Sequence, residues 1–227
     1  MDLSLWELMS HGGGAMLVVA AFSVIALAVG IERAIAQWKF VPRARALGDT
    51  VARCLARGAL EEGRSACERS PSPVADVFLV GYERLGRTKQ ENVVAAVHRE
   101  RLRVNQALRT RMWMLGTIGA LSPFVGLAGT VVGVIVGLGG FHNGQQVSFA
   151  DVAGPVSQAL VVTAAGIVVA IESMVLYNFF SQRAGRIAME MKILTDEFLE
   201  ALFDADDKKS AKKSDKSEKD DDGREAA

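Results

Sequence analysis

The sequence predicts an all-α membrane protein with three transmembrane helices, the second and third of which extend into a cytoplasmic helical domain. Two features of its 227 residues point there. Half of the residues are hydrophobic although 23% are charged, a combination that requires the two kinds to be segregated along the chain. Charge is absent from residues 8–31 and 112–150, and residues 152–182 carry Glu172 alone. About 20 apolar residues in a helix cross the hydrocarbon core of a bilayer.

The composition also excludes several classes of protein. Lys and Arg number 26 and Asp and Glu also number 26, so no net charge favours binding to nucleic acid. Two cysteines, Cys54 and Cys67, are too few for a disulfide scaffold and lack metal-ligand spacing. The histidines are scattered and no phosphate-binding loop is present. We therefore expect no enzyme, no metal site and no cofactor.

The distribution of basic residues predicts the direction of each span. Residues 1–32 contain no Lys or Arg, residues 33–111 contain 16, residues 141–151 contain none, and the remaining 10 follow Gln182. Basic residues favour the cytoplasmic side. The N-terminus and the short loop are thus expected in the periplasm of a bacterial inner membrane, and the long loop and the C-terminus in the cytoplasm. A cleaved signal peptide is the alternative for the first span, but the start MDLSLWELM is acidic and lacks the usual basic residues.

These features divide the chain into eight parts. They are a periplasmic N-terminus (1–12), the first span (13–35), a cytoplasmic helical domain (36–112), the second span (113–139), a periplasmic loop (140–154), the third span (155–180), a cytoplasmic helix (181–205) and a charged tail (206–227).

Breaks in the long loop predict several helices in the cytoplasmic domain. Gly58 separates the first two, and the third ends near Gly86. From Glu91 to Gly137 only Pro123 interrupts the sequence, which predicts one helix of about 50 residues running into the second span. Residues 206–227 contain no aliphatic side chain larger than Ala, so we expect a disordered tail.

Small residues in the spans predict close helix packing. Gly129, Gly133 and Gly137 recur every four residues on one helix face, and Gly166 belongs to a similar stripe in the third span. Such faces let helices approach closely in lipid. They serve either packing within one subunit, or an oligomer or a partner helix.

Polar residues inside a span point to function because they are costly there. The candidates are Thr130, Gln158, Thr163 and Glu172. Glu172 and Gln158 fall on nearly the same stripe of a helix, while Thr163 faces roughly the opposite side. Pro123 predicts a kink in the second span, because it cannot donate to the helical ladder.

The two apolar segments carry a recognisable pattern. GTIGALSPFVGLAGTVVGVIVGL followed by PVSQALVVTAAGIVVAIESMVLYNFF resembles the signature region of the MotA/TolQ/ExbB proton channel family. The first span, which ends in Glu32-Arg33, is similar to the first helix of that family. The resemblance covers residues 12–203, and three spans are closer to ExbB and TolQ than to the longer MotA.

The resemblance implies a homopentamer in the inner membrane. The second and third helices would line a pore that holds single-span helices of an ExbD/TolR/MotB-type partner, and a TonB- or TolA-like protein would be a further partner. Protons would be the coupling ion, and Thr130 and Thr163 match the two pore threonines of the family. Pro123 matches its proline in the second helix.

Two positions depart from the ExbB/TolQ pattern. Gln158 stands where a Glu is usual, and Glu172 stands where a Pro is usual. Gln cannot exchange a proton, which keeps a second interpretation open: a membrane scaffold with the same fold that transduces no energy. Glu172 either lines the inner exit of a proton route, pairs with an Arg of a neighbouring subunit, or has a purely structural role.

Overall fold

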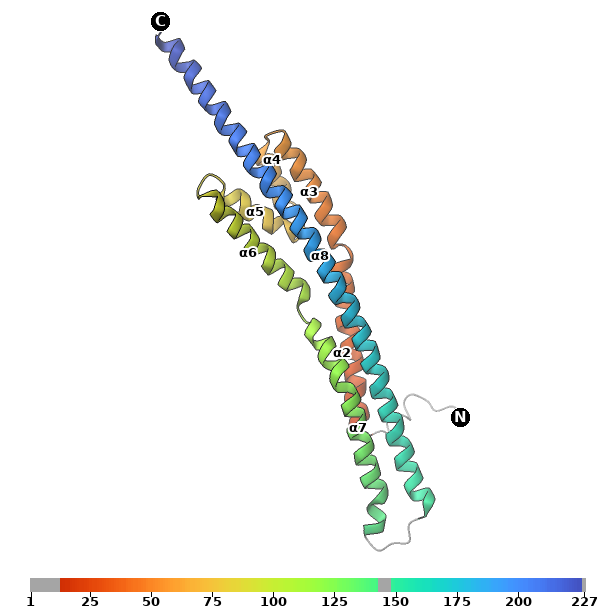
Figure 1. Ribbon diagram of the computed structural model, residues 1–227. Coiled ribbons are helices and arrows are strands. Elements are labelled where there is room, and N and C mark those ends of the chain that lie inside the picture. The colour runs from red at the N-terminus through yellow and green to blue at the C-terminus, as the bar shows by residue number, and fades with distance from the viewer. Residues whose placement is uncertain (1–12, 143–147, 226–227) are drawn as a thin grey trace. The chain divides into compact units, whose positions relative to one another are not determined.

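The computed structural model describes residues 13–142 and 148–225, and within them the side chains of residues 14–139 and 148–209. The described residues form helices and no strand (Figure 1). The helices are α2 (Gly13–Trp38), α3 (Phe40–Ala56), α4 (Leu60–Glu68), α5 (Val74–Arg84), α6 (Gln90–Arg109), α7 (Met112–His142) and α8 (Phe149–Glu225). The predicted periplasmic N-terminus, residues 1–12, lies outside the described part.

Three stretches of helix are long and apolar enough to cross a membrane, as the sequence predicts. They lie within residues Gly14–Ala56, Gln90–Gly139 and Phe149–Lys209. Large apolar side chains such as Val24, Phe124 and Ile171 are exposed on them, which suits contact with lipid rather than water. The fold is therefore an all-helical one with three candidate spans.

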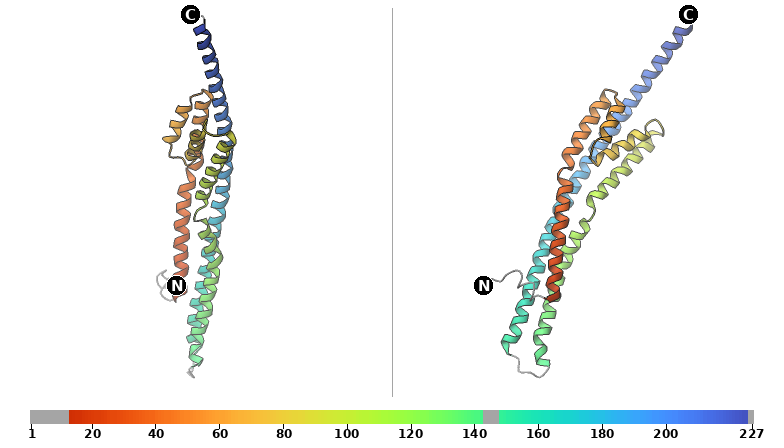
Figure 2. Two further views of the ribbon diagram at one scale, coloured as in Figure 1. Left: turned by 90° about the vertical axis from the view of Figure 1, so that its left-hand side faces the viewer. Right: turned by 180° about the vertical axis from the view of Figure 1, so that it is seen from behind.

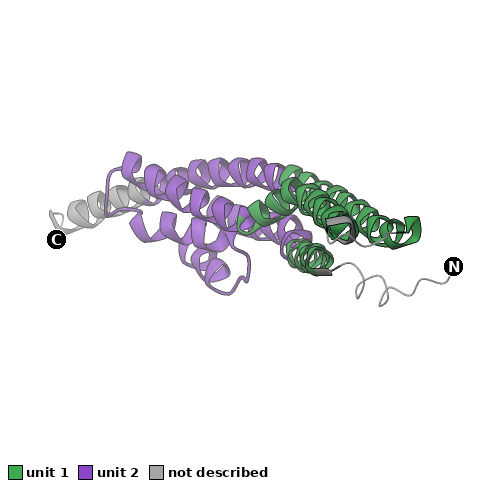
Figure 3. Cartoon of the chain, turned by 90° about the horizontal axis from the view of Figure 1, so that it is seen from below, with its two compact units in different colours: residues 1–35, 110–182 green, residues 36–109, 183–227 purple. Residues whose placement is uncertain are grey.

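The chain divides into two compact units, coloured separately in Figure 3. Unit 1 comprises residues 1–35 and 110–182, and unit 2 comprises residues 36–109 and 183–227. Unit 1 contains most of α2, all of α7 and the first part of α8. Unit 2 contains α3 to α6 and the rest of α8.

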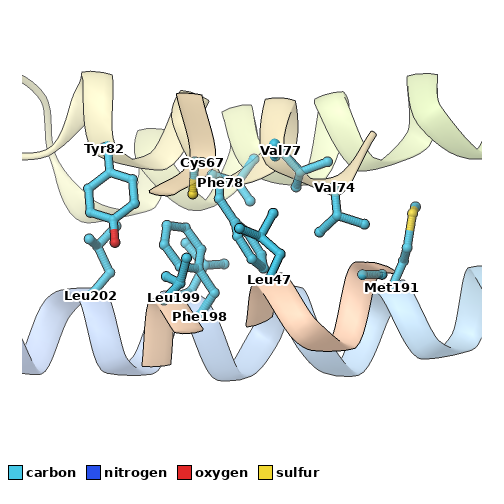
Figure 4. Close-up of a cluster of buried hydrophobic side chains, with 14 of the residues drawn as sticks. Leu47, Cys67, Val74, Val77, Phe78, Tyr82, Met191, Phe198, Leu199 and Leu202 are labelled. Carbon is cyan, nitrogen blue, oxygen red and sulfur yellow. The ribbon is translucent and has the colours of Figure 1, made fainter. Parts of the chain in front are cut away.

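Unit 2 has its own hydrophobic core, to which α8 contributes a row of apolar side chains (Figure 4). The ring of Phe198 on α8 stacks on Phe78 of α5 with centroids 4.4 Å apart, and Tyr82 meets it edge-on at 5.4 Å. Gly81 lies against Phe198, so a larger residue there would collide with the ring. Through these contacts the part of α8 in unit 2 packs on α5 and joins the core of that unit.

The turns of unit 2 follow the glycines that the sequence singles out. Gly58 lies between α3 and α4 with φ +71°, and Gly86 follows α5 with φ +69°. Only glycine adopts this left-handed conformation without steric cost. Both helix ends are therefore set locally by the sequence.

The chain between α6 and α7 differs from the expected continuous helix of about 50 residues. α6 ends at Arg109 and α7 begins at Met112, and Arg111 between them has φ +64°. The left-handed conformation costs a non-glycine residue roughly 1–2 kcal/mol. The break is invisible in the sequence because residues 90–115 contain neither Gly nor Pro.

The ends of α7 and α8 also extend further than the sequence suggests. α7 runs to His142 and α8 begins at Phe149, so the predicted loop 140–154 is helical at both ends and its residues 143–147 lie outside the described part. α8 continues to Glu225, through most of the stretch 206–227 for which the sequence predicts disorder. The segment extends a helix that is already formed, so the cost of nucleation has been met, and its lysines are good helix formers.

Candidate functional site

The candidate site in unit 1 is built on the close packing of α7 against α8, which lie side by side in Figures 1 and 2. A Cβ added at Gly126 would lie 2.9 Å from the Cα of Thr163, and one at Gly166 would lie 2.7 Å from the main-chain oxygen of Ser122. Real Cβ atoms do not come this close to backbone. Gly126 and Gly166 are therefore required for the two helices to approach as they do.

The glycine stripe that the sequence identifies on α7 faces the same interface. Gly133 lies against Ala159 of α8, and a Cβ at Gly137 would lie 3.5 Å from the Cβ of Pro155. A Cβ added at Gly129 would lie 3.0 Å from Val162 of α8 and 3.1 Å from Ala15 of α2. These glycines make contacts within one subunit, and their use in an oligomer or against a partner helix stays a prediction.

The two candidate threonines have different partners. The hydroxyl of Thr163 donates a hydrogen bond of 2.8 Å to the main-chain oxygen of Gly126, and so bridges from α8 to α7. The hydroxyl of Thr130 donates to the main-chain oxygen of Leu127 in its own helix, at 2.6 Å. A threonine that satisfies its hydroxyl three or four residues back is free of any need for an interhelical partner. Thr163 alone of the two therefore joins α7 to α8.

Gln158 lies on a groove rather than in this interface. The groove has a volume of about 580 Å³ and lies between the start of α2, α7 and α8. Its other lining residues are glycine, alanine, valine and proline, among them Gly14, Val18 and Val132. Gln158 is thus the polar side chain of an otherwise apolar lining, and the structure does not bring it together with Thr163.

Glu172 is half-buried on α8, 14 residues beyond Gln158. That separation corresponds to roughly 21 Å along a helix, so the two side chains act at different depths. Among the described side chains the Glu172 carboxylate makes no hydrogen bond or ion pair. Pro123 lies inside α7, which remains helical on both sides of it. The predicted kink at Pro123 stays a prediction.

Two further buried hydroxyls lie in the spans. Ser122 on α7 and Ser173 on α8 are both fully buried, and neither hydroxyl has a hydrogen-bond partner in the described part of the chain. Ser122 is one of several polar residues of the second span, and Ser173 follows directly after Glu172. Nothing in the pattern of the sequence distinguishes Ser173 from the other small residues of the span.

The last polar feature of unit 1 is an ion-pair cluster at one end of α2, and the sequence alone does not predict it. The carboxylate of Glu32 accepts hydrogen bonds from Arg33 at 2.8 Å and from Arg111 at 2.7 Å. Arg111 is the residue in the left-handed conformation before α7. Glu32-Arg33 is visible in the sequence as a motif, but a partner 79 residues away is not.

The described residues contain no group of three or more His, Cys, Asp or Glu side chains that could hold a metal ion. The polar groups of unit 1 are instead single hydroxyls, amides and carboxylates spaced along two closely packed helices. Such an arrangement provides hydrogen-bonding and protonatable positions across an apolar region, which suits conduction or helix contact.

Comparison with known proteins identifies the pattern. Residues 69–193 match the model of the MotA/TolQ/ExbB proton channel family, a segment that contains α7 and the membrane part of α8. The Tol-Pal system protein TolQ of Haemophilus influenzae is 27% identical over 197 residues, which cover 82% of this chain and 86% of that protein.

Two other relatives match over shorter segments. TolQ of Pseudomonas aeruginosa is 32% identical over 137 residues, or 56% of this chain and 59% of that protein. The biopolymer transport protein ExbB of Neisseria gonorrhoeae is 48% identical over 71 residues, or 31% of this chain and 32% of that protein. The chain thus matches between 32% and 86% of the length of these three relatives.

Proposed function

The chain belongs to the MotA/TolQ/ExbB proton channel family, and from that premise we propose that it is the ExbB/TolQ-like subunit of a proton-driven motor complex. It is a multi-pass membrane protein of a transport family and not an enzyme. In the proposed complex, proton-motive force is converted into mechanical work across the cell envelope. The Thr163–Gly126 bond between two tightly packed spans is the observation that carries this proposal.

The packing of α7 on α8 supports the proposal because a pore wall must hold its shape. Gly126 and Gly166 bring the two backbones into contact, and Thr163 links them by a hydrogen bond. A rigid pair of this kind can be repeated around an axis. We propose a homopentamer, in which the pair lines a pore that holds an ExbD/TolR/MotB-type single-span partner.

Protons are the proposed coupling ion, with no other cofactor. Thr130 and Glu172 are the residues of this chain that we propose for the proton route. The Thr130 hydroxyl donates within its own helix, and its oxygen can still accept a hydrogen bond. The Glu172 carboxylate is half-buried without a described partner. Gln158 can donate and accept hydrogen bonds but cannot release a proton. A protonatable group of the partner would have to supply that step.

The proposed location is the bacterial inner membrane, with the N-terminus in the periplasm and unit 2 in the cytoplasm. Basic residues are concentrated in residues 33–111 and after Gln182, which favours this direction. Partners on the periplasmic side would be of the TonB or TolA kind.

A second function is favoured by one observation. Gln158 replaces the carboxylate usual in ExbB and TolQ, and it lies in an apolar groove. A scaffold with the same fold, which assembles but moves no protons, would need no carboxylate there.

The assembly can be tested on the native complex. The full chain would carry a C-terminal tag and would be extracted from its own membrane in a mild detergent. Native mass spectrometry would then measure the mass of the complex. We expect five copies with two copies of a small single-span protein. Five copies without any partner would favour the scaffold, and a monomer would contradict both proposals.

A further inference from the structure

Basic side chains without nearby acids follow the predicted ends of the first and third spans. Residues 33–48 contain no Asp or Glu, and neither do residues 173–189. Both stretches contain several basic residues. We call four of these, all of which belong to unit 2, the basic band: Lys39, Arg43, Arg183 and Arg186. Arg183 is half-buried and the other three side chains are exposed.

Two contacts place the basic band at one level of unit 2. The guanidinium of Arg183 on α8 lies over the ring of Trp38, 5.2 Å from the ring centroid. Seven residues further along both stretches, Arg45 of α3 donates a hydrogen bond of 3.0 Å to Glu190 of α8. The two stretches therefore run side by side in the same direction, and seven residues of helix rise about 10 Å. The other three members of the basic band lie between these two contacts along the chain.

The positive charge of the basic band is not balanced within the described part of the chain. Other arginines of unit 2 have carboxylate partners, as in Arg45–Glu190, Arg64–Glu68 and Arg103–Glu100. Among the described side chains, no carboxylate lies within ion-pair distance of any member of the basic band. Like charges gathered in a band about 10 Å high repel one another, because screening in physiological salt acts over a similar length. An anion from outside the chain would relieve this repulsion.

The place of the basic band along the chain indicates an anion of the membrane surface. Trp38 and Arg183 each follow the predicted end of a span, at 35 and 180, by three residues. Trp38 ends α2 and is 65% exposed, and a Trp side chain, with an apolar ring and a polar N–H, suits the interface between membrane and water. Arginine side chains have apolar stems that can lie along the same interface. Anionic phospholipid headgroups are the anions that basic residues meet there.

We propose that the basic band binds the phosphate of an anionic phospholipid headgroup, with the Trp38 ring beside the start of the acyl chains. The ring orients the Arg183 guanidinium by a cation–π contact before the lipid binds. A guanidinium can donate two parallel hydrogen bonds to one phosphate, whereas Lys39 adds charge without this geometry. The inference needs the membrane spans but no proton transport, so its failure is distinguishable from failure of the proposed function.

The test uses the full-length protein, freed of native lipid in a mild detergent and titrated with phosphatidylglycerol or phosphatidylcholine. The two lipids carry the same acyl chains, and native mass spectrometry measures the affinity of each. We expect phosphatidylglycerol to bind at least tenfold more tightly, and equal affinities would overturn the proposal. Glycerol phosphate in hundredfold excess should not displace the lipid, because it has no acyl chains. Displacement would show a site for a soluble phosphate and would overturn the assignment to lipid.

A pair of double variants separates the basic band from net charge. Arg43→Ala with Arg186→Ala changes two exposed side chains that make no described ion pair, so the fold should persist. Each basic residue near an anionic surface contributes about fivefold in affinity, and this variant should lose most of the preference for phosphatidylglycerol. Arg87→Ala with Lys89→Ala removes the same charge at exposed positions between α5 and α6 and should keep the preference. Equal affinities of the two double variants for phosphatidylglycerol would overturn the proposal.

Discussion

The hydroxyl of Thr163 on α8 donates a hydrogen bond of 2.8 Å to the main-chain oxygen of Gly126 on α7. The bond is possible because Gly126 has no side chain: a Cβ there would lie 2.9 Å from the Cα of Thr163. Close approach and hydrogen bonding therefore depend on the same pair of residues. Helices that associate in lipid, where burial of apolar surface brings little gain, rely on such contacts.

Thr163→Val should destabilise the α7–α8 pair by about 1 kcal/mol, the upper part of the range for one interhelical hydrogen bond in a membrane. Thr130→Val is the matched control, because its hydroxyl bonds within its own helix and its loss should cost little stability. Thermal unfolding in detergent measures both. Equal stability of the two variants would contradict a structural role for the Thr163 bond.

The same two variants separate packing from transport. If Thr130 contributes to the proton route, Thr130→Val should reduce proton-dependent function several-fold while the complex still assembles with normal stability. Assembly is checked by size-exclusion chromatography, and function by complementation of a strain that lacks the gene. Full function of Thr130→Val would remove Thr130 from the route and favour the scaffold.

Gly166→Ala should cost about 1–3 kcal/mol, the usual range for overpacking, because the new methyl group would lie 2.7 Å from the main-chain oxygen of Ser122. Gly154→Ala, on the same helix, meets nothing within 4 Å and should be neutral or slightly stabilising. Resistance to unfolding by heat in detergent distinguishes the two. A stable Gly166→Ala protein would show that α7 and α8 can separate without cost.

Phe198→Ala should destabilise unit 2 by about 3–5 kcal/mol, as is typical for a buried Phe. Its ring stacks on Phe78 at 4.4 Å and is 4% exposed. Met189→Ala, on the same helix but at a side chain that is 62% exposed, should change stability little. Limited proteolysis of the full chain, followed at sites in residues 40–109, measures the difference. Similar cleavage rates for both variants would contradict the assigned core.

The pair of Arg45 and Glu190 predicts a pH dependence of unit 2. The guanidinium of Arg45 donates two hydrogen bonds to the Glu190 carboxylate, one of them 3.0 Å long, and these hold the pKa of that carboxyl below its usual value of 4.5. A carboxyl with a lowered pKa stabilises the fold above its unfolded-state pKa, and the contribution is lost as the pH falls through its folded-state pKa. Glu190→Gln should therefore unfold at a temperature that varies less with pH below about 4.5. If Glu190→Gln lost stability with falling pH as the wild type does, the pair would contribute nothing to the stability of unit 2. Exposed ion pairs in general contribute little free energy.

The buried thiols should be unreactive. Burial raises the pKa of Cys67 to about 12, so its thiolate, the reactive form, is scarce at neutral pH. Cys67 is 1% exposed and Cys54 is 6% exposed. Iodoacetamide at pH 8 should label neither cysteine in the native protein and both after denaturation. Rapid labelling of the native protein would contradict the packing of α3 on α4.

The sequence predicts most of the fold because the signals that set it are local. Uncharged runs give three candidate spans, and Gly58 and Gly86 end helices at left-handed positions. The glycine stripe of α7 and the small residues of α8 are also visible as patterns, although their use within one subunit required the structure.

The remaining features depend on contacts between distant residues. The left-handed conformation of Arg111 has no local signal, and its side chain contacts Glu32, 79 residues earlier. The helical spacing correctly separates Gln158 from Thr163, but it cannot say that Gln158 meets a groove beside α2. α8 extends to Glu225 because a helix that has already formed propagates into the residues that follow it. The composition of those residues alone does not indicate this extension.

Proton movement through the assembled complex is the central claim, and its most direct measurement is flux into lipid vesicles. The native complex, with whatever partner remains bound, is reconstituted with a pH-sensitive dye inside, and a pH difference and a membrane potential are imposed. We expect acidification faster than in protein-free vesicles, and slower with Thr130→Val. A rate equal to that of protein-free vesicles, for a complex shown to be intact, would contradict a proton channel and leave the scaffold.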